Sequence, residues 1–143
     1  MRRRHWDAGY SLVELLAVLA LAAVLAGWGS VRLAVLIQGI HLAGTAQTVA
    51  TALRLARGHA LAQGAPVEVR ADVARMIIEV RDQAGRLIDR DALARDVTVA
   101  GLPARGGFRF TGLGTTDNGT ITLATPHGAR QIVVNQRGRV RVS

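Results

Sequence analysis

The sequence predicts an α+β fold in which one long N-terminal helix packs on a small antiparallel β-sheet head. Three observations predict it. An apolar run fills residues 15–31, a helical spacing of apolar residues continues to Gln63, and from Pro66 onward apolar and polar residues alternate with the period of a β-strand. At 143 residues the chain has room for one domain of ordinary size beside a membrane segment.

The composition leaves few residues for catalysis and excludes several kinds of site. Cys is absent, which excludes a thiolate nucleophile, a disulfide framework, a lipoprotein anchor and a Cys-type zinc site. All 18 basic residues are Arg, so no Lys is present for Schiff-base chemistry. The few serines lie in the apolar segment or at the C-terminus, and the histidines have no metal-ligand spacing. We therefore expect a protein that is not an enzyme and has no metal or cofactor.

The charge balance is strongly basic. The formal net charge is +8, and removal of residues 1–9 would take away three arginines and one aspartate and leave the remainder basic. A basic exported domain attracts nucleic acid, lipid head groups or an acidic protein face. The alternative is a solubilising surface charge with no dedicated ligand.

Residues 15–31, LLAVLALAAVLAGWGSV, form the segment from which most can be inferred. A helix rises 1.5 Å per residue and needs about 20 apolar residues to cross the hydrocarbon of a bilayer, so this run and the apolar residues 33–37 that follow Arg32 qualify as a spanning helix. Arg2, Arg3 and Arg4 precede the run, and positive flanks stay cytoplasmic. The C-terminal part is therefore predicted to face outward.

Three interpretations of this segment compete: a cleaved signal peptide, a plain membrane anchor and a processed assembly helix. A signal peptide is cut after its apolar region, at a site with small residues. The candidate sites of this kind in the chain lie inside the apolar run, which argues against a signal peptide. Neither of the first two interpretations explains Glu14, a carboxylate in the first turns of an otherwise apolar span. An ionisable group in such a place is costly and by default marks function, although a Glu near the edge can also reach the cytoplasmic interface.

Residues 9–16, GYSLVELL, resemble the prepilin cleavage motif of type IV pilins and type II secretion pseudopilins. The resemblance implies that a prepilin peptidase in the bacterial inner membrane cuts after Gly9 and that Tyr10 becomes the methylated N-terminus. It also implies that the carboxylate of Glu14 pairs with the N-terminal amine of a neighbouring subunit during filament assembly. Tyr10 stands where Phe is usual. The helix also has no kinking Pro, and this second difference argues against a major pilin.

The rest of the chain follows this organisation. Residues 1–9 are the predicted leader, residues 10–37 the membrane and filament-core helix, residues 38–63 the amphipathic half of the same helix, and residues 64–143 the periplasmic head. One stripe of the amphipathic half is apolar and is predicted to pack on the head: Leu42, Val49, Leu53, Ala56 and Ala60. Gly64 and Pro66 end the helix.

The head is predicted to consist of short strands joined by glycine-rich turns. Residues 89–96 are charged and are expected to form a loop, and residues 112–119 are expected to be a hairpin loop rather than a phosphate cradle. The predicted strands are, in order, at residues 67–69, 76–80, 86–88, 97–100, 108–111, 120–125, 131–135 and 139–142.

The C-terminal hairpin is locally basic, because no acidic residue follows Asp117. In a strand, Arg139 and Arg141 face one side, and Val140 and Val142 are expected to face the core. Guanidinium groups arranged in this way can hold phosphates bidentately. The alternative is a hairpin whose outward arginines are only solvated.

The run at residues 132–141, IVVNQRGRVR, together with the long helix and the strand order, is similar to the family that joins protein H of type II secretion (GspH) to the FimT minor pilins. The resemblance covers essentially the whole chain and implies a type IV pilin-like fold. In the FimT branch this motif is implicated in binding DNA during uptake. The candidate DNA-binding residues are therefore Arg137, Gly138, Arg139 and Arg141.

Two functions are consistent with the sequence. The first is a minor pseudopilin at the tip of a periplasmic filament, with other major and minor pseudopilins, secreted cargo or the outer-membrane channel as partners. The second is a minor pilin whose arginine hairpin captures DNA. A periplasmic enzyme is disfavoured by the residue inventory.

Overall fold

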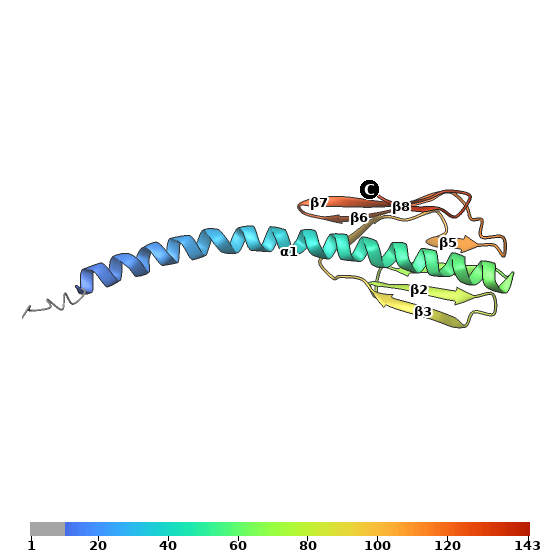
Figure 1. The fold of residues 1–143 in the computed structure, drawn as a ribbon, viewed down its shortest axis with the longest axis horizontal. Coiled ribbons are helices and arrows are strands. Elements are labelled where there is room, and N and C mark those ends of the chain that lie inside the picture. Colours follow the sequence, from blue (N-terminus) through green and yellow to red (C-terminus); the bar gives the residue numbers. More distant parts are fainter. Residues whose placement is uncertain (1–10) are drawn as a thin grey trace, which may run out of the picture. The chain divides into compact units, whose positions relative to one another are not determined.

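The computed structural model describes residues 11–143, apart from the side chains of residues 28–31. The predicted cleavage residues Gly9 and Tyr10 lie outside the described residues. The chain divides into two compact units, of which one ends at Leu36 and the other is Ile37–Ser143. The described elements are α1 (Leu12–Gln63), β1 (Val67–Asp72), β2 (Ile77–Asp82), β3 (Leu87–Ala92), β4 (Thr98–Gly101), β5 (Gly107–Phe110), β6 (Gly119–Thr125), β7 (Gly128–Val134) and β8 (Val140–Val142) (Figure 1).

The helix α1 is continuous from Leu12 to Gln63, which confirms the predicted end at Gln63. Gly64 follows with a φ of 61°, a left-handed conformation that ends helices and that Gly adopts without steric cost. In the first unit the large apolar side chains of α1 that the structure describes are exposed. By length and composition α1 is suited to cross a membrane.

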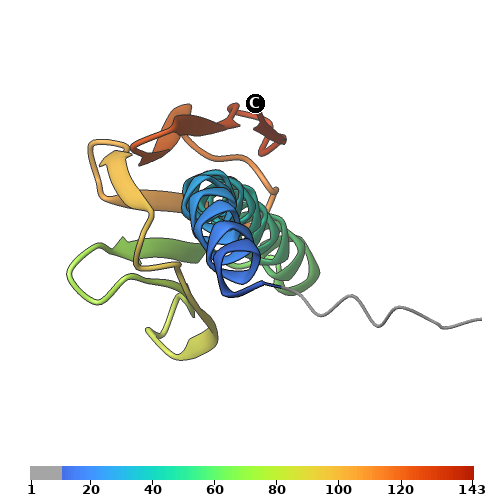
Figure 2. The same cartoon turned by 90° about the vertical axis from the view of Figure 1, so that its left-hand side faces the viewer.

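The second half of α1 packs on the head through one stripe of small and branched residues. The predicted members of this stripe are all buried, and Ala46, Ala50 and Ala52 join them. Figure 2 views the chain along the helix and shows strands on more than one side of it. Because the stripe contains many alanines, strands can approach the helix closely.

The strands form two four-stranded sheets with the orders β3-β2-β1-β5 and β4-β6-β7-β8, and every pair is antiparallel. The sequence predicts a single small sheet, so the division of the strands into two sheets was not predicted. It arises because β5 crosses over to pair with β1, where Val67 lies opposite Phe110 and Val69 opposite Phe108. The strands on either side of β5 in the sequence, β4 and β6, pair with each other instead.

The core of the head lies where α1 meets the two sheets. Its largest fully buried side chains come from all three elements: Leu53 of α1, Ile78 and Phe110 of the first sheet, and Leu123 and Ile132 of the second. In β1, β2 and β6 buried residues alternate with more exposed ones, as expected for sheets with one covered face. The fold class predicted from the sequence, a long helix on an antiparallel β-rich head, is confirmed.

The expectation of a loop at residues 89–96 is partly wrong, because β3 runs through Asp89, Arg90 and Asp91 to Ala92. These charged residues read as a loop because strands seldom contain so many. β3 is an edge strand, however, and edge strands tolerate charge. Arg90 lies directly opposite Glu79 of β2, and its Nη2 lies 2.7 Å from Oε1 of Glu79.

Candidate assembly and nucleic-acid sites

The start of α1 carries the predicted assembly residue, Glu14. Ser11 is the N-cap of the helix: its Oγ accepts a hydrogen bond from the backbone N–H of Glu14 at 3.2 Å, and its carbonyl oxygen accepts one from the N–H of Leu15 at 3.2 Å. Ser11 and Glu14 thus have the Ser-x-x-Glu spacing of a capping box. This role of Ser11 was not predicted, although the spacing is visible in the sequence. Glu14 itself is exposed in the first turn.

The predicted arginine motif lies on a tight turn between β7 and β8. Gly138 has a φ of 70°, and its N–H donates to the carbonyl of Asn135 at 2.8 Å. The side-chain Oδ1 of Asn135 accepts from the N–H of Arg139 at 2.9 Å. The turn is therefore closed by one asparagine and requires glycine where the chain passes through the left-handed region.

Gly138 also packs against two distant parts of the head. A Cβ atom at this position would overlap the carbonyl oxygen of Gly114 and would lie 2.9 Å from Cδ of Arg57. The Nε of Arg57, on α1, donates to the same Gly114 carbonyl at 3.3 Å. The turn, the loop after β5 and the helix thus meet at Gly138. No pattern in the sequence indicates the part that Arg57 plays here. Gly138, predicted as part of a binding motif, shapes and locks the turn that carries the arginines.

The structure brings Arg139 and Arg141 together on one face. Arg141 lies opposite the outward residue Val133 of β7, and Arg139, Arg141, Val133 and Asn135 line one shallow hollow of about 280 Å³. Both arginines are exposed. The prediction that they share a side of the hairpin is thereby confirmed.

Arg137 and Val142 flank the Arg139–Arg141 face, and of these two only Val142 differs from expectation. Arg137 lines a separate hollow of about 250 Å³ with Asn118, Asn135 and Gln136, so it lies beside the Arg139–Arg141 face and does not belong to it. Val142 was expected to face the core but is 38% exposed. It lies opposite Ile132 on the inward side, but it is the last residue of β8, a three-residue strand at the edge of its sheet.

The arginines of the first sheet are largely neutralised by acidic neighbours. Hydrogen bonds from Arg81 and then Arg90 lower the pKa of Glu79 below its usual value. The backbone N–H and the side chain of Arg86 likewise lower the pKa of Asp82. By contrast, no arginine after Asp117 forms an ion pair within residues 11–143. Of the six arginines in residues 64–143 that form no ion pair within the described residues, four lie on the C-terminal hairpin, and the other two are Arg95 and Arg109.

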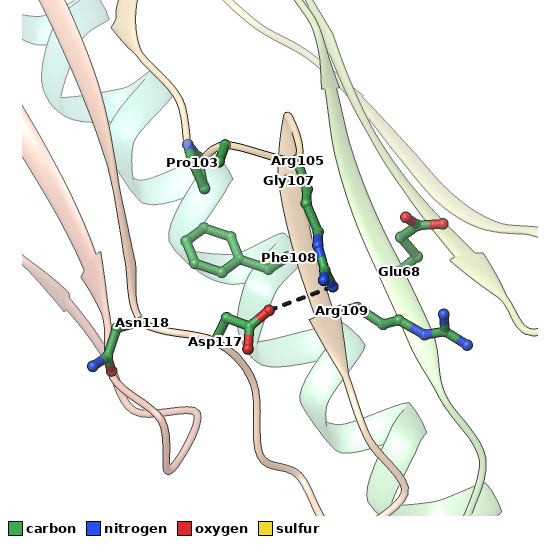
Figure 3. Close-up of a pocket in the computed structure, with 9 residues that line it drawn as sticks. Glu68, Pro103, Arg105, Gly107, Phe108, Arg109, Asp117 and Asn118 are labelled. Atoms are coloured by element: carbon green, nitrogen blue, oxygen red, sulfur yellow. Dashed lines mark ion pairs between the residues drawn. The ribbon is translucent and has the colours of Figure 1, made fainter.

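A further hollow, of about 260 Å³, lies beside β5 and is shown in Figure 3. The ring of Phe108 and Pro103 provide its apolar lining, and Arg105 lies 3.5 Å from Asp117 across it. Both charged side chains are exposed and neutralise each other. The hollow thus offers neither an unbalanced charge nor a buried polar group for chemistry.

These features define the fold class of the protein. A long helix with an exposed apolar first half, packed by its second half on antiparallel strands, is the type IV pilin-like fold. The crystal structure of the type IV minor pilin FimU from Pseudomonas aeruginosa PAO1 matches with a TM-score of 0.61 and 19% identity, over 71% of this chain and 87% of that one. The minor pseudopilin EpsH of the Vibrio cholerae type 2 secretion system matches with a TM-score of 0.58 and 16% identity, over 72% and 96%.

The family follows from a sequence comparison. The family model described as Type II transport protein GspH matches residues 45–138, which is more than half of the chain. The chain therefore belongs to the GspH family of pilin-like proteins. No curated protein is similar enough to count as a relative. The family and its structural neighbours are structural subunits rather than enzymes, and membership implies association with other pilin-like subunits.

Proposed function

We propose that the chain is a minor pseudopilin of a type II protein secretion system and forms part of the tip of a periplasmic pseudopilus. It spans the bacterial inner membrane once, with its N-terminus in the cytoplasm and its head in the periplasm. A prepilin peptidase cuts after Gly9 and methylates Tyr10. The head then contacts other major and minor pseudopilins and either secreted cargo or the outer-membrane channel.

The observation that carries this proposal is Glu14, a carboxylate in the first turn of a helix whose apolar side chains are exposed. An ammonium and a carboxylate are each costly in lipid, and they neutralise one another when two such helices pack side by side. The pairing draws a subunit out of the membrane and into a filament in one register. Membership of the GspH family supports the same role.

Loss of the chain from its native host is expected to reduce the export of folded proteins while DNA uptake is unchanged. The measurement compares secreted enzymes in the medium with those held in the periplasm, and compares transformation frequency in the same strains. Restoration of export by the full chain is the control. Normal export combined with lost transformation would reject the secretion role in favour of a DNA-uptake pilus.

The alternative function, capture of DNA by a minor pilin, is favoured by one observation. Arg139 and Arg141 lie exposed on one face of a hairpin whose arginines have no acidic partner among the described residues. Such a surface would bind phosphates without reading base sequence. No aromatic side chain lies beside it in the sequence to stack on bases.

Replacing Arg139 and Arg141 together with Gln is expected, under this alternative, to weaken DNA retention and to lower the salt dependence. Each lost phosphate contact reduces the slope of log affinity against log salt by about 0.9, so the double variant should lose roughly 2. The matched control replaces Arg75 and Arg86 with Gln, which removes the same charge from positions paired with Asp72 and Asp82. Equal losses in the two variants would indicate a net-charge effect and no hairpin site.

A further inference from the structure

Arg32 is a second charged residue in the apolar half of α1, and the proposed function does not use it. It is exposed, and it makes no hydrogen bond or ion pair within the described part of the chain. It belongs to the same compact unit as Glu14. A guanidinium without a partner in an apolar stretch must reach the interface, where water and the anionic groups of lipids can stabilise its charge.

The helix fixes the spacing between Arg32 and Glu14. α1 is unbroken across both residues, so a rise of 1.5 Å per residue separates them by about 27 Å. The separation is also about five turns, which places both residues on the same side of the helix. The two charges therefore bracket the apolar run at a distance close to the roughly 30 Å hydrocarbon thickness of a bilayer.

Side-chain direction determines where each charge would lie. Cα–Cβ bonds in a helix tilt toward its N-terminus. With a cytoplasmic N-terminus, Glu14 tilts toward the cytoplasmic head groups, whereas Arg32 tilts toward the membrane interior. The backbone at Arg32 must then lie close to the outer phosphate level for its guanidinium to stay at the interface.

We propose that Arg32 binds the phosphate groups of phospholipids at the periplasmic surface of the membrane and so sets the depth at which Glu14 is held before assembly. A guanidinium suits this partner because its planar N–H groups match phosphate oxygens bidentately. This proposal rests on the proposed membrane orientation and extends it with a lipid contact.

The apolar side chains that follow Arg32 favour a deeper position of the helix in the membrane, and Arg32 opposes it. Leu33, Leu36, Ile37 and Ile40 are exposed on α1 and would gain from entering the hydrocarbon. That gain would draw the helix toward the cytoplasm and push Glu14 out of the inner interface. On this proposal the arginine keeps these residues above the membrane, so the span ends near Arg32 and not at residue 37, and a neighbouring subunit can reach them.

Trp28, one turn before Arg32 in the sequence, allows a direct test of depth. The full chain with Trp6→Phe contains Trp28 as its only tryptophan. It is reconstituted in vesicles of phosphatidylethanolamine and phosphatidylglycerol that contain lipids brominated at successive acyl positions, and quenching of Trp28 fluorescence gives its depth. Arg32→Leu is expected to move Trp28 toward the bilayer centre by about one helical turn, ~5 Å, whereas Arg32→Lys should keep the native depth.

Arg54→Leu is the matched control, since Arg54 is an exposed arginine on the head half of α1. It should leave the depth of Trp28 unchanged. An unchanged depth in Arg32→Leu, or an equal shift in Arg54→Leu, would overturn the proposal.

The identity of the ligand is tested by solid-state NMR on the same vesicles in phosphate-free buffer. Dipolar dephasing of guanidinium ¹³C by ³¹P is expected in the native chain and should be smaller in Arg32→Lys, in which the other 17 arginines remain. Dephasing that appears only after addition of inorganic phosphate, or that is equal in the two proteins, would reject a lipid phosphate partner. These measurements use the chain without other subunits. A result against the lipid contact would therefore not bear on the role of Glu14 in assembly, which is tested separately.

Discussion

Replacing Glu14 with Leu is expected to remove the chain from the assembled pseudopilus while leaving it in the inner membrane. The substitution leaves the amine of a neighbouring subunit without its carboxylate in an apolar surrounding. Breaking one side of a buried ion pair costs about 3–5 kcal/mol, which corresponds to roughly a 100-fold or greater fall in incorporation. Sheared filament fractions, probed for the chain and normalised to its membrane pool, measure the effect.

Glu14→Gln separates the assembly role from the capping role of the same residue. Gln at this position retains the Ser-x-x-Gln form of the capping box with Ser11 but carries no charge. If the charge is what matters, Gln should fail as Leu does; if capping is what matters, Gln should restore incorporation. Intact-mass measurement must show that each variant has lost Met1–Gly9, because an unprocessed chain would be excluded for another reason. Normal incorporation of Glu14→Leu would refute the electrostatic pairing.

Local patterns in the sequence were sufficient to predict the secondary structure of most of the fold. The helix ends at Gln63 because a glycine with positive φ and a proline follow it, and both signals are local. The apolar stripe of α1 could be predicted because helical periodicity places its members on one face. The division into two sheets could not be predicted, since it depends on β5 pairing with β1 across a long stretch of chain. Alternation indicates that a residue is in a strand but does not identify its neighbour.

The same distinction applies to the candidate sites. Alternation along a strand predicts that Arg139 and Arg141 share a face, and the two residues line the same hollow. The exposure of Val142 depends on how far an edge strand extends, which no pattern within residues 139–142 indicates. The contact of Gly138 with Gly114 and Arg57 joins residues far apart in the sequence and could be found only from the fold.

Gly138→Ala tests whether that three-way contact holds the arginine turn. Alanine in a left-handed conformation costs about 1–2 kcal/mol, and forcing a methyl group against a backbone carbonyl adds about 1–3 kcal/mol of overpacking. The expected loss in the free energy of unfolding of the head is therefore about 2–5 kcal/mol, measured by denaturant titration of the full chain in detergent.

Gly85→Ala is the matched control for this variant. Gly85 has a φ of 80° but has no atom within 4 Å of where a Cβ would lie, so only the conformational cost of about 1–2 kcal/mol should appear. The difference between the two variants isolates the contact with Gly114 and Arg57. If the hairpin binds DNA, Gly138→Ala should also reduce retention, because the turn that directs Arg139 and Arg141 is displaced, whereas Gly85→Ala should not. Equal losses of stability at the two glycines would show that the turn is held by its own hydrogen bonds and that Arg57 has no part in it.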